Sequence, residues 1–497
     1  MDAMLVEETT VKRVSTVFHY LGIVCLGFAV LQALPLLVSA LFAETVRFPM
    51  RIYVIPAAAA AALGTVLLTA FRPHRLSAGA AMAVAAIGWI GLSALGALPY
   101  WIALDVSYLD ALIEAVSGLT TTGVTVLHGL DGLPHSLLFW RALTQWVGGL
   151  GIFTLFLTVA LRGESHSLLA VEAHTAFSQR LSPGLFASLR KLWLLYVCMT
   201  VACGVVLWLE GMSPFDAVAH ALSTVSTGGF STHDANIGYF RAAGYQHAAA
   251  IEATIVLFML LGATSFLLLW NLLRGRARRL FANSELRIWF LLMIAAGIIV
   301  WIGADASSSE STLRKLGETV FHVASIGTST GFTTRALADP WFSDAARLIL
   351  IALTIIGGCI GSTAGGLKVV RITLLTRLTT HQLRRSTRTP HERTVLMHDG
   401  AVISRPYMDH TLAVSFTWAA YLVLGSIITA LVTGQGALTS ASATASALSN
   451  VGPSLMPPEM LAAFNSAGKL WYILTMIAGR LEILPLLLLL SRRTWKR

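Results

Sequence analysis

Ten long apolar runs limit what this chain can fold into more than any other feature of its sequence. A helix needs about 20 apolar residues to cross the hydrocarbon core of a bilayer. Of the 497 residues, 56% are hydrophobic and 12% are charged, which leaves too few charges to cover a soluble domain of this length. We therefore predict an all-α polytopic membrane protein. Its expected spans lie near residues 16–43, 52–71, 77–104, 136–161, 188–209, 248–273, 286–304, 345–372, 409–433 and 467–491.

Basic residues gather in alternate connections between these runs. Clusters of Lys and Arg occur at 71–75, 274–279, 368–405 and 492–497, and the intervening loops are less basic and carry Asp. Ten spans put these clusters and both termini on one side, which the positive-inside rule makes the cytoplasmic side. We expect a multi-pass protein of a bacterial inner membrane. Because the charge is dispersed over loops that flank spans, nucleic-acid binding is disfavoured.

A short stretch rich in Gly, Ser and Thr occurs four times in the chain. The central residues of the four copies are Gly123, Gly229, Gly331 and Gly452. Each has a Ser six residues before it, a hydroxyl residue three before it and another hydroxyl two after it. The residues thirteen positions before these glycines are Asp110, Asp216, Glu318 and Thr439. Offsets shared by four copies indicate an internal repeat.

Each copy is built in the same order: an apolar run, a short amphipathic segment, the glycine stretch and a second apolar run. A segment of about 12 residues is roughly 18 Å long as a helix, or half a bilayer. Ser107-x-x-Asp110 and Ser213-x-x-Asp216 predict capped N-termini for two of these half-helices, with the acid in the first turn. The repeat predicts four pore loops around one central pore.

The glycine stretches can be either ion-binding backbone or contacts that let helices pack closely. Irregular backbone at membrane depth is tolerated only where protein buries it or water reaches it. Glycine permits dihedrals that turn successive carbonyls in one direction, and rings of carbonyls can replace the water shell of a monovalent cation. Small residues also allow close packing in membranes. The offsets shared by four copies favour a cation filter.

The repeats divide the chain into five parts. Residues 1–75 hold two extra N-terminal spans, and 76–185, 186–280, 281–405 and 406–497 hold pore repeats one to four. Repeat three also contains a Gly-rich stretch inside its second apolar run.

Several motifs together resemble those of the TrkH/TrkG/KtrB potassium transporter superfamily. They are SGLTTTGVTVL, LSTVSTGGFSTHD, SIGTSTGFTT, SNVGPSL, QWVGGLGIF and GGCIGSTAGGLKVVR, which are spread over nearly the whole chain. The two extra N-terminal spans and the Asn450–Pro453 sequence are more similar to TrkH than to KtrB. The resemblance implies potassium uptake by a four-repeat pore within one chain.

Further expectations follow from the resemblance. It implies a homodimer and a TrkA-like cytosolic partner that binds a nucleotide, NAD or ATP/ADP, while the chain itself holds no covalent cofactor and binds only the potassium ion. In related plant transporters, Ser in place of the first filter glycine accompanies sodium transport, whereas this chain has Gly123. The candidate filter residues are Thr121, Thr122, Gly123, Thr227, Gly228, Gly229, Ser329, Thr330, Gly331, Asn450, Val451 and Gly452.

The stretch IIGGCIGSTAGGLK, residues 355–368, interrupts the second apolar run of repeat three. Its glycines disfavour a regular helix, and they are Gly357, Gly358, Gly361, Gly365 and Gly366. A phosphate-binding loop is excluded because Leu367, rather than Lys, follows Gly366. The structural alternative is a flexible kink, whereas the resemblance implies an intramembrane loop that gates the path below the filter.

Arg480 is expected near the middle of the last span. An arginine at that depth is costly and normally faces protein or water. We predict that it faces the pore beside the Gly-rich loop as an electrostatic barrier or a latch, the alternative being that it extends to an interface. Glu482 is only two positions further on and should point elsewhere on the helix.

Other residues invite alternative functions. His220 and His322 occupy one position of the repeat and lack a partner at ligand spacing, so we expect polar contacts behind the filter and no metal site. The sequence contains neither HExxH nor GxSxG, which disfavours a membrane hydrolase. We therefore predict a transport protein and not an enzyme, with a sodium-selective or sodium-coupled carrier on the same scaffold as the alternative.

Overall fold

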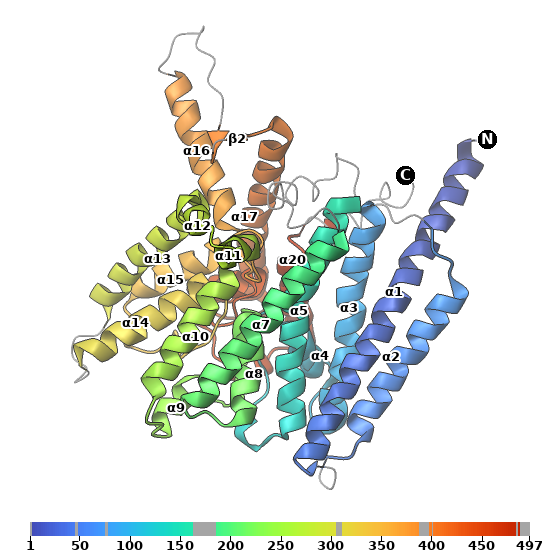
Figure 1. Cartoon of the computed structure of the whole chain (residues 1–497), viewed down its shortest axis with the longest axis horizontal. Helices are drawn as coiled ribbons and strands as arrows, with labels where there is room; N and C mark the ends of the chain where they lie inside the picture. The colour runs from blue at the N-terminus through green and yellow to red at the C-terminus, as the bar shows by residue number, and fades with distance from the viewer. Residues whose placement is uncertain are drawn as a thin grey trace.

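Long helices run between two ends of the molecule and surround a set of shorter helices (Figure 1). The computed structural model describes residues 2–44, 48–74, 78–162, 185–304, 311–386, 397–399, 401–483 and 486–487. Two short antiparallel strands, β1 (Met397–His398) and β2 (Ala401–Val402), are the only strands among the described residues. The predicted all-α fold is confirmed.

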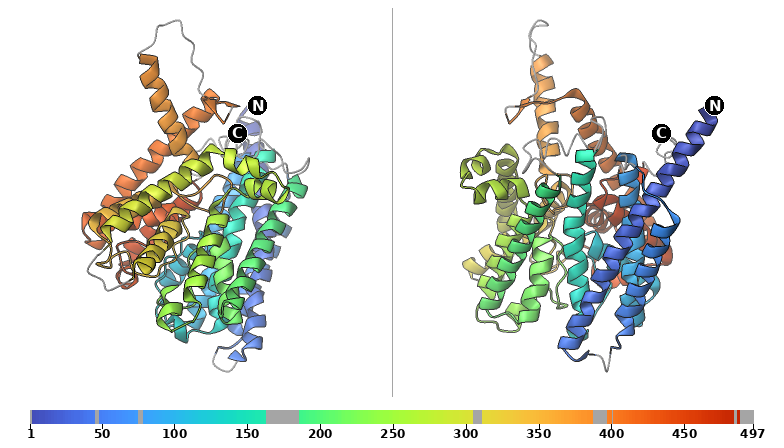
Figure 2. Two further views of the ribbon diagram at one scale, coloured as in Figure 1. Left: turned by 60° about the vertical axis from the view of Figure 1, so that its left-hand side comes forward. Right: turned by 45° about the vertical axis from the view of Figure 1, so that its right-hand side comes forward.

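The two N-terminal helices form a pair at the edge of the molecule (Figure 2). Helix α1 (Asp2–Leu41) packs along α2 (Arg51–Ala70) and also contacts the helices of the next unit. Their axes approach closely at Gly22 and Gly64, where a Cβ on either residue would lie 2.9 Å from the carbonyl oxygen of the other. This small-residue contact is typical of helix pairs in membranes, where packing replaces hydrophobic association.

Four similar units follow the N-terminal pair, and each contains a half-helix. The long helix that opens each unit is α3 (Ala78–Ala103), α7 (Leu185–Leu209), α13 (Ser284–Gly303) or α17 (Arg405–Thr433). The corresponding half-helices are α4 (Tyr108–Leu119), α8 (Pro214–Val225), α14 (Thr312–Gly327) and α18 (Ala437–Ser449). The helices that follow the glycine stretches are α5 (His135–Arg162), α10 (Ala248–Ala263), α15 (Asp344–Ile356) and α20 (Ser466–Arg480).

Side chains begin three of the half-helices as N-caps. Ser107 accepts a hydrogen bond from the Asp110 amide, and Ser213 accepts one from the Asp216 amide, as the sequence predicts. Ser311 caps α14 in the same way, so Glu318 lies two turns into that helix rather than in its first turn. Gly436 begins α18 without a side-chain cap. A serine side chain therefore caps the N-terminus of the half-helix in three of the four units.

Contacts between units close the bundle into a ring. Each half-helix packs between the helices of its own unit and against the second helix of another: α8 on α5, α14 on α10, α18 on α15, and α4 on α20. The last of these pairs joins the fourth unit to the first. Lys469 of α20 also forms an ion pair with Asp110 of α4, with 2.5 Å between Nζ and Oδ1.

Six helices among the described residues are long and apolar enough to cross a membrane by themselves. They comprise Lys12–Leu41, Arg51–Ala70, Gly79–Ala103, Ala187–Leu209, Ser284–Gly303 and Arg405–Thr433. The expected span 248–273 is instead α10 followed by α11 (Phe266–Leu273), bent by 106°. The expected span 345–372 is broken into α15, a loop and α16 (Val369–Ser386), because glycines interrupt it. The expected span 467–491 is also not continuous, since α20 ends at Arg480.

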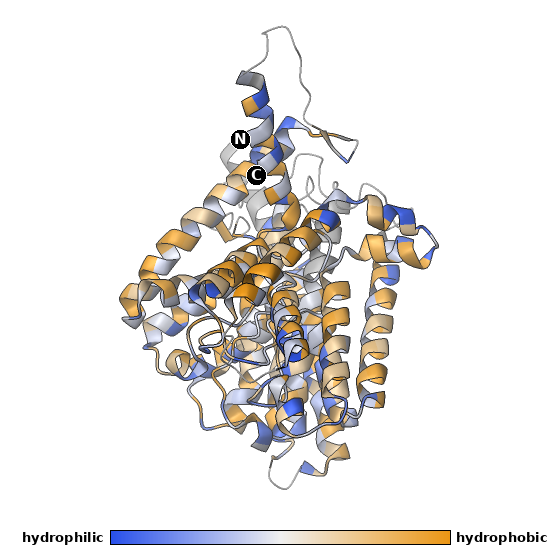
Figure 3. Ribbon diagram, turned by 90° about the vertical axis from the view of Figure 1, so that its left-hand side faces the viewer, coloured by the Kyte–Doolittle hydropathy of each residue, from blue (hydrophilic) through white to orange (hydrophobic). Residues whose placement is uncertain are grey.

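Hydropathy separates the middle of the molecule from its ends. Hydrophobic residues predominate along the middle parts of the helices, and hydrophilic residues gather toward the ends (Figure 3). One end of the molecule holds the start of α1, the arginine-bearing helix α12 (Ala277–Ala282) and the projecting helix α16 (Figure 1). The short helix α9 (Gly238–Ala242) lies at the other end. The basic cluster at 492–497 and residues 163–184 lie outside the described residues.

Candidate functional site

The four glycine stretches share one backbone conformation. The residue two before each central glycine has a left-handed φ of 51–54°, and these residues are Thr121, Thr227, Ser329 and Asn450. The central glycines Gly123, Gly229, Gly331 and Gly452 also have positive φ, of 80–102°. A left-handed Thr is strained because its side chain is branched at Cβ. The same strain in equivalent places indicates that the stretches are selected for backbone geometry.

A shared hydrogen bond ends each half-helix and begins each stretch. The amides of Thr122, Gly228, Thr330 and Val451 donate to carbonyls five residues earlier, at 2.8–3.0 Å. The acceptors are the carbonyls of Ser117, Ser223, Ser325 and Ser446. With a left-handed residue before the donor, this is the six-to-one bond of a Schellman cap. The recurring Ser therefore marks where each half-helix turns into the stretch.

The stretches lie against one another in a closed ring. A Cβ on Gly123 would press on the carbonyl oxygen of Gly228, and one on Gly229 would press on that of Thr330. In the same way Gly331 faces the carbonyl of Val451, and Gly452 faces that of Thr122. Each central glycine thus lies beside a carbonyl of the next stretch, and the fourth stretch meets the first. Twelve predicted filter residues are brought together around one axis.

Polar side chains buried behind the first stretch hold it in place. Glu114 of α4 accepts hydrogen bonds from the Thr125 hydroxyl at 3.0 Å and the Val126 amide at 3.2 Å. Arg141 of α5 forms an ion pair with Glu114 at 2.7 Å and donates to the Ser231 carbonyl of the second stretch at 2.8 Å. The guanidinium also lies over the Phe230 ring. Arg141 therefore links the first two stretches.

The predicted histidine contacts are present behind the second and third stretches. His220 Nε2 lies 3.0 Å from the Ser231 hydroxyl, and His322 Nε2 lies 3.0 Å from the Thr334 hydroxyl. Thr334 also donates to Glu318. Within the described ranges, no group of three or more His, Cys, Asp or Glu could hold a metal ion.

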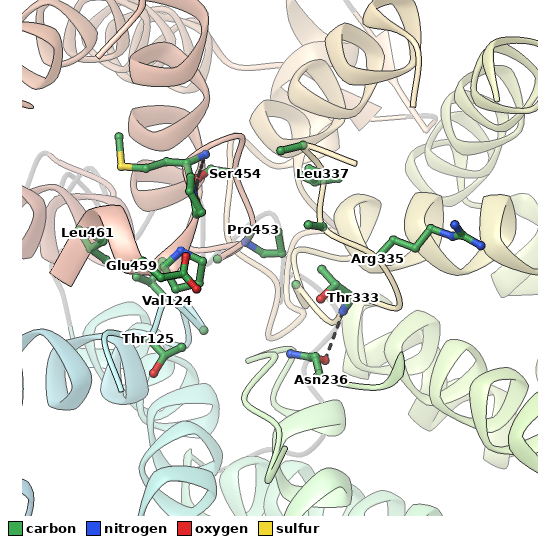
Figure 4. A pocket seen from close by; sticks show the side chains of 18 of the residues that line it. Val124, Thr125, Asn236, Thr333, Arg335, Leu337, Pro453, Ser454, Glu459 and Leu461 are labelled. Carbon is green, nitrogen blue, oxygen red and sulfur yellow. Dashed lines mark hydrogen bonds between the residues drawn. The ribbon is translucent and has the colours of Figure 1, made fainter. Parts of the chain in front are cut away.

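A cavity of about 470 Å³ opens on one side of the ring. Residues from all four units line it, including Thr125, Asn236, Thr333 and Pro453 (Figure 4). Asn236 Oδ1 accepts a hydrogen bond from the Thr333 amide at 3.3 Å, which joins the second and third stretches. The charged residues Asp234, Glu459 and Arg335 also line the cavity, and Arg335 lies 3.6 Å from Glu318. Two carboxylates against one guanidinium, which itself has an acidic partner, leave an excess of negative charge that attracts cations.

The Gly-rich loop covers the opposite side of the ring. Gly357 ends α15 with a φ of 72°, and Gly361 and Gly366 each have a φ of 73°. The Gly365 amide donates to the Ser329 hydroxyl at 2.6 Å, and a Cβ on Gly365 would press on the Ser449 carbonyl. The loop thus contacts two of the strained stretches directly.

The loop is also bound at the bend between α10 and α11. The Cys359 amide donates to the Ala263 carbonyl at 3.1 Å, and the Phe266 amide donates to the Gly361 carbonyl at 3.0 Å. Packing at Gly358 is similarly tight, because a Cβ there would lie 3.1 Å from the Ala263 oxygen. The Gly-rich loop thus packs against the bend between α10 and α11, and backbone groups that neither helix can satisfy at these two interruptions hydrogen-bond to each other.

Arg480 is the last residue of α20 and not, as the sequence suggests, a residue in the middle of a span. The helix ends there because Glu482 and Ile483 adopt left-handed φ angles. The buried guanidinium donates to the Thr363 carbonyl of the loop at 3.2 Å and to the Gly148 carbonyl of α5 at 2.8 Å. Arg480 therefore lies beside the loop, where the prediction placed it. Glu482 is expected on another face of the helix, but it lies beyond the end of α20 in the left-handed turn, and its carboxylate pairs with Arg371.

Comparison with known proteins places this architecture in a family. Residues 50–496 match the family described as TrkH, cation transport protein. The chain belongs to the TrkH family. The resemblance inferred from the motifs is confirmed, and the prediction of a transport protein rather than an enzyme agrees with the family.

Individual TrkH proteins are similar to this chain over most of its length. The Trk system potassium uptake protein TrkH of Salmonella typhimurium is 34% identical over 428 residues, covering 82% of this chain and 84% of the relative. TrkH of Halomonas elongata is 32% identical over 504 residues, covering 97% and 99%. The crystal structure of the potassium transporter TrkH from Vibrio parahaemolyticus matches with a TM-score of 0.83 at 30% identity, again covering 97% and 99%.

Sequence reasoning missed several buried residues of this TrkH family member. Glu285, near the start of α13, accepts a hydrogen bond from the Ile360 amide of the loop at 2.8 Å. Gln145 of α5 contacts the second stretch through its side-chain amide. For Gln145 and Arg141 the available signal is a polar side chain within the apolar run 136–161. Glu285 lies in the polar segment just before the run 286–304 and carries no such signal.

Replacing Gly331 by Ala is expected to abolish cation uptake. The new methyl group would overlap the Val451 carbonyl and approach Pro453, and φ at this position is 84°. Gly129→Ala is the matched control, because Gly129 has a φ of 70° but no atom within 4 Å of its Cβ position. Rubidium uptake at equal protein levels in the membrane should be lost in the first variant and retained in the second. Equal uptake by both would contradict a tightly closed ring.

Proposed function

We propose that this protein carries out potassium uptake across the inner membrane of a bacterium, through a filter made by the four glycine stretches. The observation that carries the proposal is the closed ring, in which each central glycine lies beside a carbonyl of its neighbour. Such a ring can replace the hydration shell of a monovalent cation. The TrkH relatives are named as potassium uptake proteins, and this supports potassium as the substrate.

We assign the ion contacts to backbone groups in each stretch. In every stretch they belong to the central glycine and the two residues before it. The four half-helices direct their C-terminal ends toward these residues, and the negative end of a helix dipole favours a cation there. The alternative is a sodium-selective or sodium-coupled carrier on the same scaffold. Gly123 argues against it, since the family resemblance associates sodium transport with Ser at that position.

Gly123→Ser is expected to admit sodium without abolishing flux. Its Cβ would lie 2.4 Å from the Gly228 carbonyl oxygen, a less severe overlap than the 1.8 Å between a Cβ on Gly331 and the Val451 oxygen, so the filter distorts rather than closes. Rubidium and sodium fluxes into proteoliposomes measure the change, with Gly129→Ser as the control for a left-handed position outside the ring. Wild-type selectivity in folded Gly123→Ser protein would count against the filter.

We further propose that the Gly-rich loop, residues 357–366, gates the path on the side of the ring opposite the cavity. Its contacts with Ser329 and Ser449 support this proposal, because they bring the loop backbone against the third and fourth stretches. Arg480 and Glu285 hold it from two sides, one by donating to Thr363 and the other by accepting from Ile360. A guanidinium at this point also repels cations. Opening the path then requires breaking a small number of hydrogen bonds in which one partner is a charged side chain.

Removing the gate is expected to raise basal flux and leave ion preference unchanged. Each hydrogen bond to a charged group contributes about 1.5–3 kcal/mol, so Arg480→Ala should increase basal rubidium flux by about ten- to a hundredfold. Deletion of residues within 357–366 should increase it at least as much. Arg347→Ala serves as the control, since Arg347 lies in the first turn of α15 and donates to the carbonyls of Ala338 and Asp339, whereas the loop follows the other end of that helix. Basal flux at the wild-type level in folded deletion protein would show that the loop is not the gate.

The basic end of the molecule is proposed to bind a cytosolic regulator. Arg276 at the N-cap of α12 and Arg278 and Arg279 within that helix are exposed, and α16 projects from the same end (Figure 1, Figure 2). By the positive-inside rule this end is cytoplasmic. The Trk system name of the relatives and the family resemblance support a TrkA-like partner that carries NAD or ATP/ADP, with the transporter as a homodimer. Anionic lipid is the alternative ligand for these arginines.

Neutralising Arg276, Arg278 and Arg279 to Gln is expected to weaken co-purification of the full-length transporter with its TrkA-like partner. Removing three exposed positive charges lowers the attraction to an acidic surface, and the loss should shrink as salt is raised. Arg72→Gln is the control, because Arg72 is an exposed arginine at the start of a different connection. Undiminished binding by the triple variant would remove this loop from the docking site.

A further inference from the structure

The stretches of the ring are held by different devices, and in the fourth the Asn450 side-chain amide donates to the Thr122 hydroxyl at 3.0 Å and the Met476 carbonyl at 2.9 Å. In the first stretch the hydroxyls of Thr120 and Thr122 are hydrogen-bonded at 2.7 Å, and in the third those of Thr328 and Thr330 are hydrogen-bonded at 2.7 Å. Each pair joins the residues one and three positions before the central glycine. These two stretches are therefore braced from within by their own side chains.

The second stretch lacks this internal brace. Gly228 stands where the first and third stretches have Thr122 and Thr330. The hydroxyl of Ser226 turns back to the carbonyls of Leu222 and Ser223, at 2.8 and 3.1 Å. Two consecutive glycines have the greatest backbone freedom of any dipeptide. Without an outside contact, this quarter of the ring would be its most mobile part.

Gln145 of α5 supplies that outside contact with both ends of its amide. Nε2 donates to the Gly228 carbonyl at 2.6 Å, and Oε1 accepts from the Phe230 amide at 3.1 Å. The two bonds bracket Gly229, the central glycine. Gln145 is fully buried, so water does not compete for either bond. The Gly228 oxygen that it holds is the one that lies against Gly123 in the ring.

The amide of Gln145 and a side chain at position 228 exclude each other. A Cβ on Gly228 would lie 2.6 Å from Cδ and 2.7 Å from Oε1 of Gln145. Gly228 does not have a positive φ, so its backbone does not itself require glycine. The absence of a side chain at 228 is explained by the room that Gln145 occupies.

We propose that Gln145 is a positioning residue that determines ion selectivity, by fixing the second stretch in place of the missing hydroxyl pair. This inference rests on the proposed filter. A ring whose second quarter is fixed cannot contract there around a smaller cation. Without Gln145 the Gly228–Gly229 segment keeps only the longer bond from Asn236 Nδ2 to the Gly229 carbonyl, at 3.3 Å, and can move toward sodium. Gln145 thus acts on the ion through the Gly228 carbonyl and does not need to touch it.

The first test removes both hydrogen bonds and keeps the side-chain volume. Gln145→Leu is expected to lower the rubidium-over-sodium flux ratio in proteoliposomes by about three- to tenfold, the effect of losing one modest hydrogen bond. Gln32→Leu is the matched control, because Gln32 is equally buried and donates to the Leu95 carbonyl at 2.8 Å, away from the ring. A flux ratio in Gln145→Leu equal to that of the control overturns the proposal.

The second test exchanges one device for the other. Gly228→Thr alone should lose uptake, because its side chain overlaps Gln145. Gly228→Thr combined with Gln145→Gly should recover uptake and selectivity, because it also removes the Gln145 Cβ, which would lie 3.0 Å from a Cβ at 228, and the new hydroxyl can then pair with Ser226 as in the first and third stretches. A double variant that performs no better than either single variant overturns the proposal, whatever amount of the single variants reaches the membrane.

Failure of this proposal is distinguishable from failure of the filter. If Gly123→Ser admits sodium while Gln145→Leu keeps wild-type selectivity, the filter stands and the role of Gln145 is refuted. If Gly123→Ser changes nothing, the filter itself is refuted, and the proposal for Gln145 is refuted with it.

Discussion

Left-handed backbone at eight equivalent positions is the constraint on which the rest of this structure depends. Two residues in each stretch adopt positive φ, and four of them carry side chains that disfavour it. Such residues cost on the order of 1–3 kcal/mol each and persist only where their surroundings hold them. The Schellman caps, the buried pairs behind the stretches and the contacts between neighbours are those surroundings. The helices of the bundle fix the ends of the stretches in turn.

Much of the arrangement of half-helices and glycine stretches can be predicted from the sequence, because the same sequence pattern occurs four times. The recurring Ser and Gly offsets predict the four stretches, and Ser107 and Ser213 predict where two half-helices begin, since capping depends on neighbours in the chain. The all-α fold follows from the apolar runs. Caps, glycine turns and apolar runs each depend on residues that are close together in the chain, and for that reason the sequence predicts them.

What the sequence could not predict depends on contacts between distant segments. Arg480 seemed to lie within a span, because the apolar residues after it hide the left-handed turn at Glu482 and Ile483. The bend between α10 and α11 is unmarked by proline and is stabilised by the loop from another unit. Gln145 and Glu285 act on backbone groups 83 and 75 residues away along the chain. Only the folded structure brings such partners together.

Carrying all four stretches on one polypeptide has a consequence for how the ring can change. In a ring of four identical subunits, every substitution would appear four times and alter all sides at once. Here a substitution at Gly228, Val451 or Asn450 alters one side and leaves the other three intact. The residues before the central glycines already differ, as Thr, Gly, Thr and Val. A covalently joined ring can therefore diverge one quarter at a time, in small and separately tolerated steps.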